Sequence, residues 1–458
     1  MKDILRLGAG SGFWGDALDP GMELLERGQL DYLCFDFLAE LTMALLQRQK
    51  MKDPKAGYIP DAVQYMNAML PKALDRGTRL ISNGGGVNIR AAAERIAESA
   101  RSGGLRGARI GLVEGDELLD KIDLLQARGV PMANMDTGDE NFAAIRDRVV
   151  SANVYTDSTG IVEALEGNAD VVITGRVSDN ALYVGPMVHE FGWKRDTAHT
   201  DLLAAAVTIG HIVECAAGCT GGMSSRFAEM PRMGQVGFPI VECRPDGTAD
   251  ITKLPNSGGR VDLFTVKEHL VYEIADPRSY LMPDAVADFT SLRLEEIDVD
   301  RVRVSNIKGK PAPDLVKLVV GYQDGWIGET TAFFPWPNAY DRAIKARETM
   351  LERFERMGLV ADQIHFDLVG LGMLHGPAAP SPDPALANQM CEVGLRCAVR
   401  TRTREEADKV RRAGTHLWIM GPGGTSFGTP MKPRPIVALW PTLIPREFVQ
   451  QRTEILIA

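Results

Sequence analysis

Residues 5–16 read LRLGAGSGFWGD, and the order of residue types in this stretch indicates the fold class of the first half of the chain. The apolar run at its start stops at a series of glycines, which predicts a β-strand followed by a glycine-rich turn and a helix. Glycine lets main-chain N–H groups come close to a bound ligand, so Gly10 and Gly12 are candidate binding residues. The alternative is a plain tight turn.

The spacing of these glycines differs from that of the dinucleotide-binding fingerprint. A G-x-G-x-x-G motif that starts at Gly8 requires glycine at position 13, where this chain has Phe13. The sequence therefore disfavours a nicotinamide oxidoreductase. Asp16 closes the loop, either as a helix cap or as an acid/base group.

Similar strand-and-turn units recur through residues 1–225. Short apolar runs alternate there with polar turns and helical stretches, which is typical of an α/β domain with an open parallel sheet flanked by helices. The further strands are predicted at residues 31–35, 79–82, 109–113, 153–155 and 169–174. In such sheets, ligands bind in the crevice outside the carboxyl ends of the strands.

Residues that follow these strands are candidates for a site that binds an anionic small molecule. The expected binding residues are Gly10, Gly12, Asn83, Gly84, Gly85, Asn88, Thr159, Arg176 and Ser178. The acid/base candidates are Asp16, Asp157 and Asp179, and Asp36 also follows a strand. An arginine directly after a strand suits bidentate capture of a carboxylate or phosphate. Turns and helix caps explain many of the other residues without a ligand.

Residues 201–219 form an almost uncharged run that predicts one buried helix. His211, Cys215 and Cys219 recur in it at every fourth position and would share one helical face. Imidazole and thiolate are zinc ligands, but one straight helix cannot close a tetrahedral site with these three, so we expect core packing and no metal. His211 and Glu214 are a candidate acid/base pair.

Two further segments follow this helix. Residues 226–297 are rich in proline and glycine and predict a connecting segment with short strands. Ser257, Gly258 and Arg260 lie there in a loop that is either a second anion-binding element or a surface turn. Residues 298–458 predict an α+β domain of the ferredoxin-like sandwich type. Its predicted elements include helices at 338–357 and 404–414 and a strand at 416–420.

The composition disfavours several classes of protein. With 51 Lys plus Arg and 61 Asp plus Glu, the formal net charge is −10, which argues against nucleic acid or an anionic membrane as partner. No apolar run approaches the roughly 18 residues that span a bilayer, and the N-terminus lacks signal-peptide character. Six cysteines in 458 residues, mostly in apolar segments, indicate reduced thiols. We therefore expect a cytoplasmic protein.

Several motifs resemble those of one known family. They are GAGSGFWGD at 8–16, SNGGGVN at 82–88, YTDSTGIVEAL at 155–165, VITGRVSDNALYVGP at 172–186, GHIVECAAGCTGG at 210–222, LPNSGGRVD at 254–262 and WIMGPGGTSFGTP at 418–430. From about residue 5 to residue 446, the chain resembles the acyclic terpene utilisation AtuA family. The resemblance implies a role in bacterial catabolism of branched acyclic terpenoids such as citronellol and geraniol, which proceeds through carboxylated acyl-CoA intermediates. Longer relatives carry an additional C-terminal ferredoxin-like domain, so a separately encoded small subunit of that fold is an expected partner.

The leading hypothesis is a hydratase or dehydratase that acts on an anionic branched carboxylate or acyl-CoA. This reaction needs no cofactor, and CoA would enter only as part of the substrate. Other lyase or isomerase chemistry on the same substrates remains open. The alternative is a non-catalytic acyl-CoA-binding or scaffold subunit of a multi-protein complex, and we expect a homo-oligomer. Nucleophilic catalysis is disfavoured because no G-x-S-x-G elbow occurs and Cys215 is predicted to lie within a helix.

Overall fold

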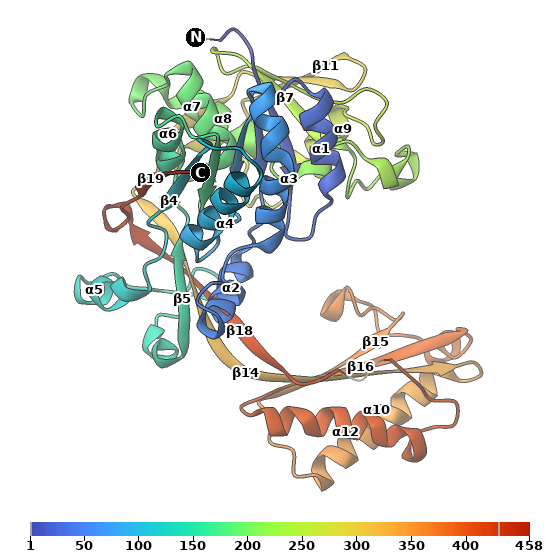
Figure 1. Cartoon of the computed structure of the whole chain (residues 1–458). Coiled ribbons are helices and arrows are strands. Elements are labelled where there is room, and N and C mark those ends of the chain that lie inside the picture. Colours follow the sequence, from blue (N-terminus) through green and yellow to red (C-terminus); the bar gives the residue numbers. More distant parts are fainter. Residues whose placement is uncertain (1, 429–430) are drawn as a thin grey trace. The chain divides into compact units, whose positions relative to one another are not determined.

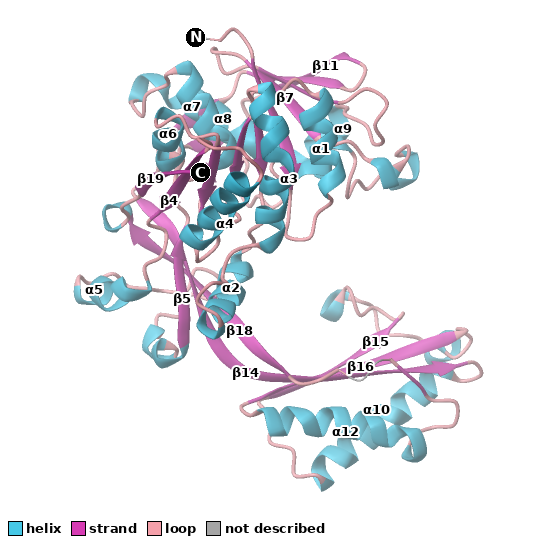
Figure 2. Cartoon of the chain, viewed as in Figure 1, coloured by secondary structure: helices cyan, strands magenta, loops and turns pink. Residues whose placement is uncertain are grey.

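The computed structural model describes residues 2–428 and 431–458, and the chain divides into two compact units (Figure 1). Unit 1 comprises Met1–Gly321 and Leu439–Ala458, and unit 2 comprises Tyr322–Ala438. Both units combine helices with strands, as the colours in Figure 2 show. The fold class is therefore mixed α/β.

Unit 1 is built on a ten-stranded sheet. Its strands are, in spatial order, β11 (Arg293–Asp298), β12 (Arg301–Ser305), β8 (Ala249–Lys253), β7 (Pro239–Cys243), β1 (Leu5–Ser11), β2 (Tyr32–Phe35), β3 (Arg79–Ser82), β6 (Val171–Thr174), β4 (Arg109–Glu114) and β19 (Arg452–Ile457). The neighbours from β1 to β4 in this order pair parallel, as predicted. The remaining pairs are antiparallel, so the prediction of a parallel sheet holds only for its centre.

The central strands are mostly apolar because helices cover both faces of this part of the sheet. Leu33 of β2 and Ile81 of β3 are fully buried, and each such side chain stabilises the fold by roughly 2 kcal/mol. β7 and β8 form the hairpin that the Pro-Asp-Gly sequence at 245–247 predicts. Gly247 takes the positive φ of 81° that this turn requires.

Six of the helices of unit 1 pack in two groups around this sheet. The helices of unit 1 are α1 (Leu18–Arg27), α2 (Glu40–Lys52), α3 (Pro60–Arg76), α4 (Ile89–Ser102), α5 (Ile122–Ala127), α6 (Thr159–Glu166), α7 (Ala181–Phe191), α8 (Thr200–Val213) and α9 (Leu263–Leu270). One group consists of α1, α3 and α4, and the other of α6, α7 and α8 (Figure 1).

Helix α8 is almost wholly buried, as its uncharged sequence predicts, but the predicted helix at 201–219 is too long. The α-helix ends at Val213, and a short 3-10 turn, η5 (Ala216–Thr220), follows. Ala216 adopts a positive φ of 45°, a backbone conformation that an α-helix excludes. Cys215 and Cys219 therefore do not continue the helical face of His211, which corrects the sequence-based expectation.

Shorter strands complete unit 1. β9 (Tyr280–Leu281), β10 (Val286–Asp288) and β13 (Lys308–Lys310) form a three-stranded sheet in the order β13-β10-β9. β5 (Val149–Val154) pairs with β14 (Leu315–Pro335). The expectation that residues 153–155 form another strand of the parallel sheet is therefore wrong.

Unit 2 is an α+β unit. Its elements are the later part of β14, α10 (Ala339–Arg356), β15 (Gln363–Val369), α11 (Pro384–Ala387), β16 (Glu392–Thr401), α12 (Arg404–Met420), β17 (Ser426–Phe427) and the first residues of β18 (Arg434–Pro445). The sheet runs β15-β16-β14-β17, with antiparallel neighbours, and its core is shared with α10 and α12. The predicted strand at 416–420 is wrong, because α12 continues to Met420 and buries Leu417 on the same face as Val410.

Two expectations from composition can be compared with the structure. None of the helices in residues 2–428 and 431–458 is long and apolar enough to cross a membrane. All six cysteines are free thiols, and four of them are buried. No cysteine is part of a disulfide.

Candidate functional site

The carboxyl ends of the central parallel strands bring Asp36 and Asn83 together. Asp36 follows β2 and Asn83 follows β3, and the Asn83 amide donates to Asp36 Oδ1 over 2.6 Å. The backbone N–H of Leu38 donates to the same oxygen over 3.1 Å. Burial raises the pKa of Asp36, and the nearby charge of Arg176 opposes this effect. Asp36 is therefore a buried carboxyl group held in place by its neighbours.

Arg176 follows β6 and lies beside Asp36, with only 1% of its surface exposed. Its Nε–H donates to the carbonyl of Val177 over 2.9 Å, and Nη1 donates to the carbonyl of Leu38 over 2.5 Å. Nη2 forms an ion pair with Asp179, and the guanidinium carbon lies 4.2 Å from the centre of the Tyr155 ring. The guanidinium is thus fixed by several neighbours.

Asp116, which sequence reasoning did not single out for the site, supports the loop that carries Arg176. Its Oδ2 accepts hydrogen bonds from the backbone N–H of Arg176 over 2.9 Å and from the side chain of Asn153 over 2.8 Å. Burial raises the pKa of Asp116. A Cβ on Gly175 would lie 2.3 Å from this carboxylate, so only glycine leaves it room.

His211 and Glu214 meet at the C-terminal end of α8, as their spacing predicts. The distance from His211 Nδ1 to Glu214 Oε1 is 3.3 Å, and the Tyr280 hydroxyl lies at the same distance from Nδ1. His211 Nε2 lies 3.2 Å from the carbonyl of Leu270, and a carbonyl only accepts, so Nε2 carries a proton. Nδ1, the other ring nitrogen, faces Glu214.

Glu214 is a buried carboxyl group whose ionised form is disfavoured. Burial raises the pKa of Glu214, the hydrogen bond from His211 opposes this, and the charge of Asp36 adds to the rise. Its second oxygen, Oε2, is buried and has no hydrogen-bond partner among residues 2–428 and 431–458. A buried oxygen without a partner is costly, which makes it a natural contact point for a ligand.

Aromatic rings surround His211 in a cluster that sequence reasoning missed. Ring centres lie 4.8 Å away for Tyr280, 5.6 Å for Phe289 and 5.8 Å for His269. Burial lowers the pKa of His269 to about 4, so this histidine is neutral at pH 7. Within the described ranges, His269 Nε2 and the Tyr183 hydroxyl are also buried without a hydrogen-bond partner.

The glycine-rich loop after β1 packs against the turn that follows Glu214. A Cβ on Gly12 would lie 2.7 Å from the carbonyl carbon of Cys215, so this close approach requires glycine. The Gly12 N–H donates to Asp16 Oδ2 over 2.8 Å, and Asp16 Oδ1 accepts from Ala17 N–H over 2.8 Å. Burial raises the pKa of Asp16. Asp16 thus closes the loop, and a Cβ on Gly10 would collide with the Phe35 ring.

Three of the expected binding residues shape the loop after β3. A Cβ on Gly84 would meet Ala62, and one on Gly85 would meet the carbonyl of Thr174. The Asn88 side chain donates to the carbonyls of Pro54 and Ala56. These contacts fix the conformation of the loop, and this conformation places Asn83 beside Asp36.

Asp157 and Thr159 lie in different surroundings. Asp157 accepts from Arg446 Nη1 over 2.9 Å, from the Gln451 amide over 2.7 Å and from Thr159 N–H over 2.9 Å. Burial opposes ionisation, but the charge of Arg195 and the bonds from Thr159 hold the pKa of Asp157 below its usual value. Asp157 lines a separate cavity of about 340 Å³ together with Arg195.

The remaining expected residues are placed as follows. Ser178 Oγ lies 3.0 Å from Asn180 Oδ1, in the same loop as Arg176. Gly258 N–H donates to the carbonyl of Gln235, and Ser257 Oγ donates to that of Leu254. The side chain of Arg260 is exposed and lies 3.9 Å from Asp262, while its backbone N–H donates to the carbonyl of Thr220.

No group of three His, Cys, Asp or Glu side chains in the described part of the chain could hold a metal ion. Burial raises the pKa of the Cys215 thiol above its usual range, which keeps it a thiol at neutral pH. The side chains gathered here therefore offer proton transfer and hydrogen bonding, with Asp36 and Glu214 as the carboxyl groups whose pKa values are raised.

A family model described as "Acyclic terpene utilisation family protein AtuA" matches residues 5–455, which is nearly the whole chain. No curated protein and no solved structure matches the chain.

Proposed function

The chain belongs to the AtuA family of acyclic terpene utilisation, and from this premise we propose that it is a cofactor-independent hydro-lyase of that catabolism. Its substrate would be a branched unsaturated carboxylate or the corresponding acyl-CoA, with CoA serving only as part of the substrate. The reaction is the addition of water to a carbon–carbon double bond next to the carboxylate or thioester, or the reverse.

One observation carries this proposal: of two buried carboxyl groups, Asp36 and Glu214, the first raises the pKa of the second by its charge. Burial raises the pKa of both, and the charge of Asp36 raises that of Glu214 further. A pair of this kind favours one shared negative charge over two. One member is then a base while the other is an acid, which is what a hydration or dehydration requires.

In the hydration direction, ionised Asp36 takes a proton from water, and the water oxygen forms a bond to the carbon farther from the carboxylate or thioester carbonyl. The electron pair of the double bond takes the proton of Glu214 at the carbon next to that carbonyl. Dehydration is the same sequence reversed: ionised Glu214 takes the proton from that carbon, the double bond forms, and the C–O bond breaks as Asp36 protonates the departing hydroxyl. No electron leaves the substrate in either direction.

His211 acts in this scheme as a positioning residue. Its Nε2–H is held by the carbonyl of Leu270, so Nδ1 faces Glu214 Oε1 and the Tyr280 hydroxyl. The interaction orients the carboxyl group and leaves Oε2 for the substrate. The positive charge of Arg176 favours the ionised form of Asp36. The remaining N–H groups of Arg176 and the hydroxyl of Ser178 are the proposed contacts for the substrate anion.

Turnover of a substrate panel in ²H₂O tests the proposal. The panel consists of β-methyl-branched, α,β-unsaturated acids and their CoA thioesters, analysed by mass spectrometry for added water and for deuterium at the α-carbon. We expect both with at least one substrate, and retention of both in the control variant Glu229→Gln, which changes an exposed glutamate. Tight binding of a CoA thioester with no deuterium uptake would instead support a non-catalytic acyl-CoA-binding subunit.

Partners are a further part of the proposal. The order β14-α10-β15-β16-α12-β18 in unit 2 supports our interpretation of it as a ferredoxin-like sandwich. Trp418, Ile419 and Met420 at the end of α12 are exposed apolar side chains, and such patches favour association. They support the proposed assembly with a second copy or with a small separate subunit.

A further inference from the structure

The sheet of unit 2 has an open edge at β15. In the described ranges, β15 pairs with β16 along residues 363–369 and with no other strand, while α10 and α12 cover one face of the sheet (Figure 1). The outer edge of such a strand presents backbone N–H and C=O groups that another strand can bind. An edge of seven residues is long enough for a complete strand pair.

The side chains of β15 alternate between two environments. Phe366 and Leu368 pack on the core shared with α10 and α12, so the even-numbered positions face these helices. His365 and Asp367 lie on the other face, where His365 Nε2 is 2.7 Å from Asp367 Oδ1 and Asp367 Oδ2 accepts from Arg396 Nη1 over 2.8 Å. The open edge therefore carries an apolar row on one face and a polar row on the other.

This pattern is complementary to itself. A two-fold axis perpendicular to the sheet at Phe366 places a second β15 antiparallel to the first, and every residue then lies opposite one of the same face. Ile364, which is 41% exposed, meets Leu368 of the second copy. His365 meets Asp367 of the second copy, so each imidazole has a carboxylate on the neighbouring strand as well as on its own.

The neighbouring two-fold registers are less favourable. An axis at Asp367 sets two carboxylates opposite each other, and an axis at His365 sets Asp367 opposite Gln363. Both leave residues at the ends of the seven-residue strand unpaired, whereas the axis at Phe366 pairs all of them. Charge and strand length thus select the same register.

We infer that β15 is the contact surface for a second copy of this chain, with the two strands antiparallel and Phe366 at the two-fold axis. The inference rests on the assembly in the proposed function and narrows it to one partner and one surface. Trp418 belongs to a different surface, because its ring stacks on Phe427 of β17 at the opposite edge of the sheet. No residue of the proposed reaction takes part in the contact.

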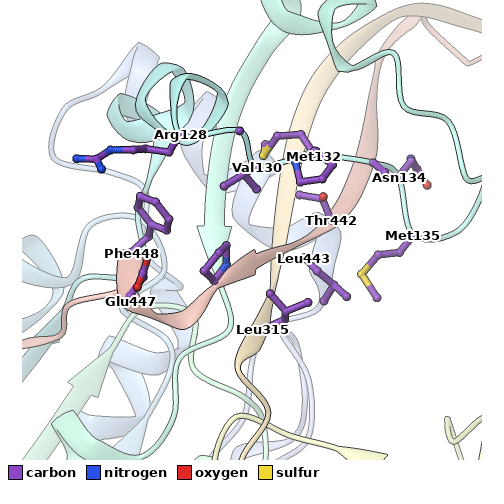
Figure 3. A pocket seen from close by; sticks show the side chains of 14 residues that line it. Arg128, Val130, Met132, Asn134, Met135, Leu315, Thr442, Leu443, Glu447 and Phe448 are labelled. Atoms are coloured by element: carbon purple, nitrogen blue, oxygen red, sulfur yellow. The ribbon is translucent and has the colours of Figure 1, made fainter.

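Sedimentation velocity of the full chain at micromolar concentration measures the association. We expect wild type to sediment as a dimer and Ile364→Asp to raise the dissociation constant at least about tenfold, because the symmetry repeats each lost contact. The matched control is Leu443→Asp, which adds the same charge to a side chain that is 39% exposed. Leu443 lies beside Leu315 in a groove of unit 1 (Figure 3), and its variant should remain a dimer.

Paired cysteines test the register, also if Ile364→Asp does not fold. In a Cys391→Ser background, which lacks this exposed thiol, Gln363→Cys with Val369→Cys sets two thiols opposite each other across the axis, within the reach of a disulfide. Positions 363 and 369 lie at opposite ends of the strand, about 20 Å apart, so neither single variant can cross-link. Oxidation should give a covalent dimer with the double variant only.

A monomeric wild type would overturn both this interface and the assembly proposed above. A dimer that Ile364→Asp leaves intact, or that Leu443→Asp or Trp418→Asp dissociates instead, would overturn this interface alone. Failure of the double cysteine variant to cross-link, or a covalent dimer from a single variant, would contradict the register. Turnover of the substrate panel is a separate measurement, so the proposed reaction and this interface fail independently.

Discussion

His211 Nδ1 and Glu214 Oε1 lie 3.3 Å apart at the buried end of α8, and the opposite nitrogen of the imidazole is held by the carbonyl of Leu270. This arrangement fixes which nitrogen of His211 faces Glu214 and which carboxylate oxygen it meets. The second oxygen of Glu214 is left for another partner. The proposed chemistry depends on this relationship, and it gives a first prediction.

Replacing His211 with asparagine should change the pH dependence of turnover more than its maximum. The hydrogen bond from His211 lowers the pKa of Glu214, so its loss raises that pKa further. The limb of the pH–rate profile that requires ionised Glu214 should then move to higher pH. An unchanged profile would mean that His211 does not control the ionisation of Glu214.

His269 should make the protein less stable in acid. Its pKa is about 4 in the folded protein and 6.5 in an unfolded chain, so unfolding takes up a proton between these values. The stability that depends on neutral His269 is complete above about pH 6.5 and is lost as the pH falls toward 4. Urea unfolding at about pH 7 and about pH 4.5 should show a loss about 2–3 kcal/mol larger in wild type than in His269→Gln. Equal losses in the two proteins would contradict the assignment.

Arg176→Ala should destabilise the fold by about 3–5 kcal/mol. The substitution removes the positive charge that compensates the buried carboxylate of Asp36. It also removes the hydrogen bond that Arg176 donates to the carbonyl of Leu38. Chemical denaturation measures this loss. The control is Arg260→Ala, whose exposed side chain should change stability by no more than about 0.5 kcal/mol. A loss below about 1 kcal/mol for Arg176→Ala would show that its main role is in ligand binding.

Gly12→Ala should destabilise the protein by about 1–3 kcal/mol, because the added methyl group meets the backbone of Cys215 and backbone atoms cannot rotate away. Gly234→Ala is the matched control, since a Cβ there meets nothing within 4 Å, and its effect should stay within about 0.5 kcal/mol. Equal thermal stability of both variants would show that the loop and the η5 turn separate easily.

The local sequence predicts the positions of several residues of this candidate site. The apolar runs that end in Asp36 and Asn83 predict strands whose carboxyl ends meet, and the three-residue spacing of His211 and Glu214 predicts their contact. Tyr280 could not be found in this way, because its contact with His211 joins segments 69 residues apart and no motif marks it. Tertiary packing alone brings such residues together.

The sequence-based errors have a similar origin. The run from His416 to Met420 is short and apolar, and periodicity over so few residues does not separate a strand from the last turn of a helix. The composition of residues 153–155 predicts a strand but not its partner, and long-range pairing joins β5 to β14. Short strands are predicted within residues 226–297, but their antiparallel pairing with the main sheet depends on long-range contacts in the same way.

The rate of hydration or dehydration by Glu214→Gln, compared with wild type on a branched substrate that wild type converts, tests the proposed reaction most directly. Glutamine keeps the shape of the side chain but cannot take up a proton. We expect kcat to fall at least about a hundredfold while thermal stability is retained or raised, because a buried carboxyl is no longer forced to ionise. A kcat within about twofold of wild type would contradict the assignment of Glu214 as the base.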